Sequence, residues 1–387
     1  MTTAHITDLG PLPDFLDKHD DADMLAIPTP GGTAWLVRDY SLARRVLADQ
    51  RFSRAAAAAP GNTKAADVQP TAASMMSMDG AEHLRLRRVL TGAFSPKRMT
   101  ALTPSIEALA DRYLDSMIAA GPVVDLIAHV ATPMPLSVLC TLLGVPREDH
   151  TLFKDWVDVL FDLSVSTPRE KARRRLEISA YMSDLITAKR GTTDEDVLMD
   201  MILAHDEGRM SVSELLTMGL TLLMAGYQTT VGQIGVAVHA LLSNRTAYEA
   251  LLNDPGLLDG TVDELIRLTP STPLAFIRVA VEPLPLGSVE VAAGDTVIVS
   301  LLHGNRDGAA FPDPLQLHPD RDGNGHLTFG YGPHRCLGAT LARLQLRIVL
   351  DRLLNRLPRL RIADCPDAVV WMDGMAVRGL SQFLVEW

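Results

Sequence analysis

The helical periodicity of the long central part of the chain constrains its fold most. From about residue 81 to residue 243 the apolar residues mostly recur at intervals of three and four, the spacing of one face of an α-helix. Another helix is predicted to end at Pro270, and a last long one to run over residues 337–357. The buried stripe of that last helix is predicted to consist of Leu337, Leu341, Leu344 and Ile348. The chain is therefore expected to be mainly α.

A smaller β portion is predicted near both ends. Residues 25–29 and 34–37 flank a Pro-Gly-Gly turn and predict a hairpin, which a helix through Leu47 follows. Further strands are predicted over residues 277–281, 289–291 and 296–302, then a meander over residues 305–325, and short strands in the last thirty or so residues. The alanine-rich residues 54–73 predict a mobile loop. Because there is neither a repeat nor a linker, we expect one domain over residues 1–387.

Composition and charge limit the cellular compartment and the binding partners that we expect. The formal net charge of −11 over 387 residues gives no reason for nucleic-acid binding by the whole surface. The longest apolar stretch, residues 215–225, is too short to cross a bilayer, and the first residues carry neither a basic leader nor an apolar run. Three cysteines at wide spacings argue against a disulfide framework. We expect a cytoplasmic monomer that binds neither nucleic acid nor membrane.

The segment over residues 329–338, Phe-Gly-Tyr-Gly-Pro-His-Arg-Cys-Leu-Gly, places one cysteine directly before the last long helix. Its first two glycines permit tight turns and a close approach of the backbone to a flat ligand. Backbone N–H groups at a helix start favour the thiolate form of a cysteine. Taken alone, Cys336 is also compatible with an ordinary buried cysteine. A zinc site is disfavoured, since His334 and Cys336 lack the paired ligand spacings.

Two charged pairs fall on predicted helices. Glu264 and Arg267 are three residues apart and share a helix face, as do His83 and Arg87, four residues apart. The second pair would suit a carboxylate ligand, which arginine can bind in a bidentate way. Each pair also has a non-functional interpretation: the first could be an exposed ion pair, and the second a solvated basic face of a helix.

One long helix is predicted to begin at a capping box formed by Ser211 and Glu214 and to run without interruption to about Ser243. Gly226 lies in its middle, where glycine costs about 1 kcal/mol relative to alanine and so calls for a reason. A small residue lets a ligand approach, and the nearby Thr229 can bond back to a helical carbonyl or reach that ligand. A core helix with an incidental glycine is the alternative.

Taken together, these motifs resemble the cytochrome P450 family. Residues 329–338 match its haem-binding signature, Phe-Gly-x-Gly-x-His-x-Cys-x-Gly, at every defined position, and the other motifs follow in the family's order over nearly the whole chain. The resemblance implies the triangular helical prism of the P450 fold, haem b as cofactor and Cys336 as the axial iron ligand. The other cofactor-binding residues that it implies are His83, Arg87, Ala225, Arg278, Phe329, Gly330, His334 and Gly338. Glu264, Arg267 and Arg321 would form a buried network that braces the meander.

Residues 225–230, Ala-Gly-Tyr-Gln-Thr-Thr, are similar to the family's oxygen-activation motif. The resemblance makes Gly226, Gln228 and Thr229 the candidate catalytic residues, with Thr229 as the alcohol. Gln228 stands where the family usually has an acid, and an amide can hold water but cannot relay a proton by ionising. We therefore expect proton delivery to depend on Thr229 with ordered water, or on a group of the substrate.

The implied activity is a monooxygenase reaction, hydroxylation or epoxidation of a bulky hydrophobic molecule in antibiotic or other secondary metabolism, with the substrate free or on a carrier protein. Electrons would come from ferredoxin and its reductase through a basic docking patch of Arg85, Arg88, Arg335, Arg343 and Arg347, unless these arginines are merely solvated. The substrate pocket is expected to include Met75, Met76, Met78, Met224, Leu274, Ala275, Phe276, Ile277, Met375 and Ala376, with core packing as the alternative for each methionine. Oxidative coupling, peroxide-driven oxidation or a non-catalytic haem protein are the rival functions.

Overall fold

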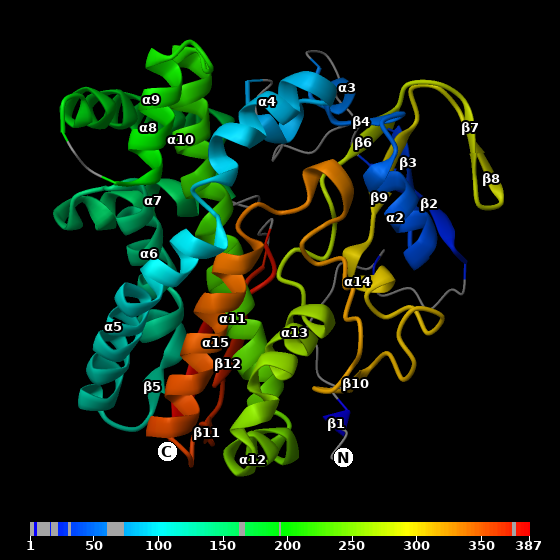
Figure 1. Ribbon diagram of the computed structural model, residues 1–387. Coiled ribbons are helices and arrows are strands. Elements are labelled where there is room, and N and C mark those ends of the chain that lie inside the picture. The colour runs from blue at the N-terminus through cyan, green and yellow to red at the C-terminus, as the bar shows by residue number, and fades with distance from the viewer. Residues whose placement is uncertain are drawn as a thin grey trace.

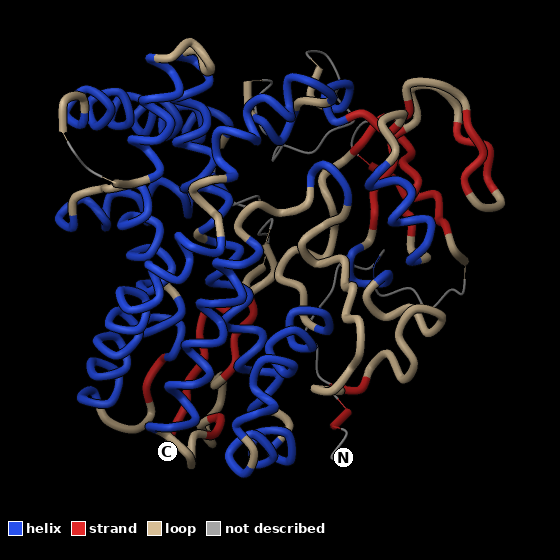
Figure 2. The backbone as a smooth tube through the Cα atoms, viewed as in Figure 1, coloured by secondary structure: helices blue, strands red, loops and turns tan. Residues whose placement is uncertain are grey.

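The computed structural model describes residues 4–5, 16, 22–29, 32–59, 73–161, 167–192, 195–373 and 377–387. Most helices gather on one side of the molecule and most strands on the other (Figures 1 and 2). The helices are α2 (Tyr40–Ala48), α3 (Arg54–Ala57), α4 (Gly80–Thr91), α5 (Pro96–Ala120), α6 (Pro133–Leu143), α7 (His150–Phe161), α8 (Pro168–Lys189), α9 (Val197–Asp206), α10 (Val212–Gly226), α11 (Gln228–Leu242), α12 (Arg245–Asn253), α13 (Leu258–Leu268), α14 (Leu301–Gly304) and α15 (Ala339–Arg356). The prediction of a mainly α chain with a smaller β portion is confirmed.

The strands form a five-stranded sheet in the order β2-β3-β9-β6-β4, two short pairs, and a small sheet in which β13 lies between β11 and β12 and also pairs with β5. In the large sheet β3 and β9 run parallel and the other neighbours antiparallel. The strands are β1 (Ala4–His5), β2 (Met24–Thr29), β3 (Gly32–Val37), β4 (Phe52–Ser53), β5 (Val124–Asp125), β6 (Arg278–Ala280), β7 (Leu284–Leu286), β8 (Val289–Val291), β9 (Thr296–Val299), β10 (Gln316–Leu317), β11 (Arg361–Ile362), β12 (Val369–Trp371) and β13 (Leu380–Glu386). The hairpin predicted before residue 40 is β2 and β3.

The core of the helical side is built around α11. Every residue of this helix except Thr229 is buried, which is the pattern of a helix surrounded on all sides by other elements. Helix α15 packs against α11 and lies side by side with α5, and the short strand β12 is close to α11 (Figure 1). None of the described helices is both long and apolar enough to span a membrane.

The single long central helix was a wrong prediction, because the structure has two helices, α10 and α11, that meet at Tyr227. Tyr227 has φ −86° and ψ −78°, which ends the regular hydrogen bonding. The Thr229 and Thr230 hydroxyls donate to the carbonyls of Ala225 and Gly226 at 2.7 and 2.8 Å. Hydroxyl donors thus occupy two carbonyls that backbone N–H groups of a continuous helix would have used, which is how threonines bend helices.

Three smaller predictions are also corrected. The strand predicted to reach residue 302 ends at Val299, because the Ser300 hydroxyl accepts from the His303 N–H and caps α14. Strand β7 was not predicted; its Pro285 lies in a two-stranded hairpin where the missing N–H is tolerated. The predicted mobile loop begins instead as helix α3, whose first residue, Arg54, is buried; residues 60–72 lie outside the described part of the chain.

The meander before the cysteine packs directly on α13. A Cβ atom on Gly260 would lie 1.8 Å from the carbonyl oxygen of Pro319, so only glycine permits this approach. One turn further along α13, Glu264 is fully buried and accepts hydrogen bonds from Arg267 at 2.6 and 2.8 Å and from Arg321 at 3.2 Å. Arg267 also donates to three carbonyls of the meander, those of Asn305, Pro314 and Gln316. The alternative of an exposed ion pair is thereby excluded.

Candidate active site

The cysteine segment forms a compact turn between the meander and α15. Gly330 and Gly332 have φ of +70° and +71°, a backbone region that favours glycine. A Cβ on Gly332 would also meet the backbone of α2, with the Cα of Ala48 at 2.9 Å. The Cys336 N–H donates to the Phe329 carbonyl at 2.7 Å and closes the turn. Gly330 and Gly332 are therefore needed for the backbone conformation of this segment, and Gly332 also for its close contact with α2.

Opposing influences act on the Cys336 thiol. The residue keeps an exposed surface, but desolvation by the surrounding protein raises the pKa of its thiol. A hydrogen bond from the Gly338 N–H and the positive charges of Arg87 and Arg335 act in the opposite direction. This combination suits a cysteine that becomes a thiolate when a metal ion takes the place of its proton.

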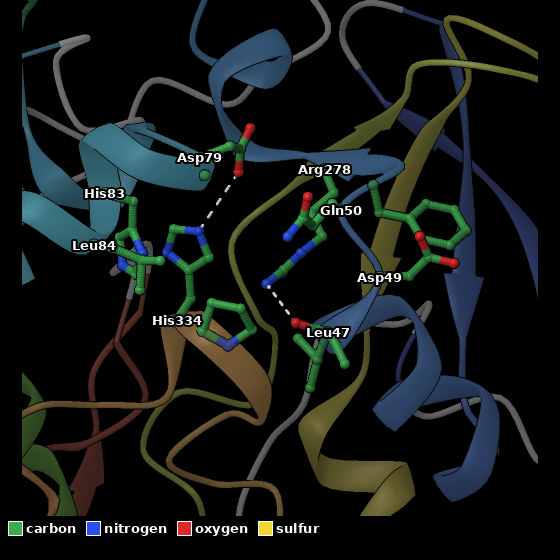
Figure 3. A pocket seen from close by; sticks show the side chains of 12 residues that line it. Leu47, Asp49, Gln50, Asp79, His83, Leu84, Arg278 and His334 are labelled. Atoms are coloured by element: carbon green, nitrogen blue, oxygen red, sulfur yellow. Dashed lines mark hydrogen bonds and ion pairs between the residues drawn. The ribbon is translucent and has the colours of Figure 1, made fainter.

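Basic side chains from three distant segments meet beside this turn. His83, from α4, and His334, from the cysteine segment, stack with their ring centroids 4.2 Å apart. Arg87, one turn further along α4, donates to the Arg335 carbonyl at 2.6 Å. Arg278, from β6, is buried and faces the same cavity of about 50 Å³ that His83 and His334 line (Figure 3).

Burial and mutual repulsion lower the pKa values of this cluster. The pKa of Arg278 falls to about 10 through burial, and that of His83 to about 4 through burial and the neighbouring charges of His334 and Arg87. Burial also lowers the pKa of His334, which Asp79 partly offsets from 3.6 Å away (Figure 3). Groups whose cationic forms are this unfavourable are suited to a bound anion.

Arg54 belongs to the same cluster and was missed by the sequence analysis. It is 1% exposed, and burial together with the charge of Arg278 lowers its pKa to about 9. Its guanidinium donates to the carbonyls of Met76, at 2.9 Å, and of Ile277. No local pattern marked it, because it follows β4 within an alanine-rich stretch and meets its partners only in the folded chain.

Asp79 is the second residue that the sequence analysis missed. It stands at the start of α4 without capping it, and accepts instead from the Ser53 hydroxyl at 2.6 Å and from the Ala55 N–H at 2.9 Å. Burial works to raise the pKa of this carboxyl, but the nearby His334 ring and the hydrogen bonds from Ser53 and the α3 backbone hold it well below its usual range. Asp79 thus anchors the start of α3 and the His334 ring to α4.

The charge balance of the cluster fits haem. Arg54, Arg87 and Arg278 carry three positive charges and Asp79 one negative charge, a net charge of +2 when both histidines are neutral. The two propionates of a haem would compensate this charge. An accessible cysteine at a glycine-shaped turn is, in addition, the ligand type that haem-thiolate chemistry requires. The residues present therefore fit the group implied by the sequence.

The residues of the predicted oxygen-activation motif lie at the junction of α10 and α11. Gln228 is buried in the first turn of α11, and the Thr229 hydroxyl donates to Ala225. The Ser271 hydroxyl donates to the Thr229 carbonyl at 2.9 Å and ties the junction to the segment after α13. Gly226 has a packing reason, because a Cβ there would lie 2.6 Å from the Leu139 side chain of α6.

The residues predicted to line a substrate pocket divide into two groups. Met75 and Ile277 are buried within hydrophobic clusters, which supports core packing as their role. The others are less buried: Met76, Met78, Met224, Leu274 and Ala275 are partly buried, and Phe276 is 45% exposed with its ring 5.0 Å from the Arg54 guanidinium carbon. Met375 and Ala376 lie outside the described residues.

The predicted docking patch needs correction, because carboxylates neutralise three of its five arginines. Arg85 pairs with Glu82 and Glu214, Arg343 with Asp263, and Arg347 with Asp259. The two remaining members, Arg88 and Arg335, are exposed.

Comparison with known proteins agrees with the fold and the motifs. The family model described as Cytochrome P450 matches residues 29–359. The chain is 38% identical over 361 residues to nocardicin C N-oxygenase of Nocardia uniformis subsp. tsuyamanensis, covering 92% of this chain and 90% of that protein. It is 37% identical over 384 residues to cytochrome P450 monooxygenase PikC of Streptomyces venezuelae, covering 97% and 91%.

Solved structures give the same result. The crystal structure of the LnmA cytochrome P450 hydroxylase from the leinamycin biosynthetic pathway of Streptomyces atroolivaceus superposes with a TM-score of 0.89 at 36% identity, covering 98% of this chain and 97% of that one. Family model, full-length relatives and fold all agree, and the chain therefore belongs to the cytochrome P450 family and is a P450 monooxygenase.

Proposed function

We propose that this monooxygenase uses haem b to hydroxylate or epoxidise a bulky, mostly hydrophobic small molecule in the biosynthesis of a natural product, with electrons from ferredoxin. The observation that carries the proposal is the cationic cluster of net charge +2 beside Cys336, which suits a haem with two free propionates. The relatives support the reaction class, since their names include a hydroxylase and an N-oxygenase of antibiotic pathways.

Cys336 would ligate the iron, while Arg54, His83, Arg87, Arg278 and His334 would hold the propionates. The macrocycle would lie against Phe329, Gly330, Gly338 and Ala225. When bound, haem would supply the iron centre at which dioxygen is activated, with the electrons coming from ferredoxin. The chain's own residues orient the substrate, exclude water and deliver protons.

We expect Arg54→Met to weaken haem retention by about tenfold or more, since it removes a buried positive charge and leaves the Met76 and Ile277 carbonyls without their donor. The measurement is the rate of haem transfer to apomyoglobin. Arg51→Met is the matched control, because Arg51 is an exposed neighbour paired with Asp49, and we expect it to leave that rate unchanged. Equal rates in both variants and in wild type would remove Arg54 from the haem site.

Proton delivery is expected to differ from that of relatives with an acid at position 228. A glutamate placed there would be buried, and burial raises a carboxyl pKa toward neutrality. We therefore expect Gln228→Glu to add an ionisation between about pH 5 and 8 to the kcat profile, with a change of about tenfold across it. Gln228→Asn is the control and should follow the wild-type profile, because it keeps an amide. If the Glu variant also follows it, position 228 lies off the proton path.

The proposed function is tested by oxygen consumption with NADPH, ferredoxin and its reductase over a panel of macrolide-like and peptide-like compounds. Consumption that depends on both NADPH and compound, with a product heavier by one oxygen atom, supports it. A product formed only with hydrogen peroxide favours the peroxide-driven alternative, and a product joined without added oxygen favours oxidative coupling, which Gln228 keeps open. Haem binding without either consumption or product overturns the proposal.

The exposed pair Arg88 and Arg335 is the remaining candidate for ferredoxin docking. Replacing both by glutamine is expected to raise the KM for ferredoxin severalfold at low ionic strength, because surface charges mainly steer association. The difference should fade at high salt. A double Arg173→Gln/Arg361→Gln variant removes the same charge from other exposed sites. An unchanged KM in the docking variant would discard the patch.

A further inference from the structure

A groove of about 370 Å³ opens between α5, α6 and α7. On α6 it is lined by Pro133, Ser137 and Thr141, which recur every four positions and so share one face of the helix. Leu139 lies on a different face of α6 and contacts Gly226 at the central helix junction. The groove is therefore separated from the candidate active site by the thickness of one helix.

The walls of the groove combine an apolar floor with polar groups. Leu109 and Leu136 are buried and form part of the floor. The Tyr113 and Ser137 hydroxyls lie 2.7 Å apart and are hydrogen-bonded to each other. A volume in this range is typical of sites for small organic molecules.

Basic side chains surround this floor, although the chain as a whole is acidic with a net charge of −11. They are Arg112, Arg147, His150 and Lys154. Burial lowers the pKa of His150, and so do the charges of Arg147 and Arg112, which places both guanidinium groups within electrostatic reach of the His150 ring.

Two of the four basic side chains are not neutralised by carboxylates of the described residues. Among the described residues neither Arg112 nor Arg147 forms an ion pair, and Arg112 instead donates to the Tyr113 hydroxyl at 2.7 Å and lies over its ring. The nearby Asp149 accepts from the Tyr181 hydroxyl at 2.5 Å. The His150 Nε2 atom is buried without a hydrogen-bond partner in the described structure. A bound anion would give the exposed guanidinium groups of Arg112 and Arg147 a charged acceptor in place of water.

We propose that this groove binds a small organic anion, an apolar body with a carboxylate or a phosphate, as a second site separate from the active site. Arg112, Arg147 and His150 would hold the anionic group, and Leu109 and Leu136 the apolar body. The proposal is independent of the proposed function, because none of these residues belongs to the haem site.

Calorimetric titration of the haem-loaded protein with 2-naphthoate tests the proposal, while the Soret band reports any binding next to the haem. We expect about one equivalent to bind without a Soret change. The uncharged 2-naphthamide should bind at least about tenfold more weakly, since it lacks the charge that guanidinium groups recognise. If 2-naphthyl phosphate binds more tightly than 2-naphthoate, the natural anionic group is a phosphate. If it binds more weakly, the natural group is a carboxylate.

The double variant Arg112→Gln/Arg147→Gln should lower the affinity for naphthoate by about tenfold or more, the loss of charge-assisted hydrogen bonds. Arg173→Gln/Arg361→Gln removes the same charge elsewhere and should bind as wild type. Ala128→Phe fills the groove without changing its charge and should also weaken binding; it is the test variant if the double variant does not fold. Undetectable binding, equal affinity for the amide, affinity unchanged in the groove variants, or binding seen only as a Soret change would each overturn the proposal.

Discussion

Cys336→Ser abolishes the long-wavelength Soret band that thiolate-ligated haem shows when the reduced protein binds carbon monoxide, and substrate oxidation falls below detection with it. This is the expected result, because a serine hydroxyl cannot replace the electron donation of a thiolate that promotes cleavage of the O–O bond. The measurement is the carbon monoxide difference spectrum of dithionite-reduced wild type and variant, side by side.

The chain provides matched controls for this experiment. Cys365 is the partly exposed cysteine near the C-terminus, and Cys140 is a buried core residue whose thiol pKa burial raises to about 12. Cys365→Ser and Cys140→Ser should both retain the long-wavelength band. A band that survives in Cys336→Ser, or that wild type never shows, would contradict ligation by Cys336 and reopen the assignment of the site.

Arg267→Met is expected to lower the free energy of unfolding by about 3–5 kcal/mol, the usual consequence of leaving one partner of a buried ion pair alone. Arg267 and Glu264 are both 0% exposed, so water cannot replace the lost hydrogen bonds. The variant also leaves the carbonyls of Asn305, Pro314 and Gln316 without this donor, and the meander leads directly into the cysteine segment. We therefore also expect a reduced haem content. Urea denaturation measures the loss of stability, and absorbance measures the haem content.

Arg190→Met is the control for this prediction, because it breaks an ion pair with Asp206 in which both side chains are nearly half exposed. Its expected effect is below about 1 kcal/mol. The double variant Glu264→Gln/Arg267→Met should recover part of the loss, since the uncompensated carboxylate is then gone. Equal losses in Arg267→Met and Arg190→Met would show that the buried network does not brace the meander.

Much of the fold could be predicted because its signals are local. The apolar periodicity of α5, α13 and α15 repeats within each segment, and the segments that flank Pro-Gly-Gly in the sequence form the paired strands β2 and β3. The central helix was mispredicted for a physical reason, since its apolar pattern continues unbroken through Tyr227. Whether the Thr229 hydroxyl bonds back to a carbonyl or outward depends on the surroundings, which the pattern does not contain.

The candidate site shows the same division. His83 and Arg87 share a helix face, and residues 329–338 are contiguous, so both could be recognised as motifs. Arg54 and Asp79 carried no such signal, because each has a contact with a residue more than two hundred positions away in the chain. Arg54 donates to the Ile277 carbonyl, and Asp79, besides its hydrogen bond from Ser53, lies beside His334 of the cysteine segment. The ion pairs of Arg85 with Glu214, of Arg343 with Asp263 and of Arg347 with Asp259 were likewise invisible in sequence, and they removed most of the predicted docking patch.

By itself, the sequence determined the helical class, the glycine-shaped turn before α15 and the identity of the candidate thiolate, since these depend on neighbouring residues and on backbone preferences. Only the tertiary structure decided which charges are buried, which are neutralised and where α10 ends. It also created the groove between α5 and α7. These properties depend on desolvation and on contacts between distant segments, and both arise only when the chain is folded.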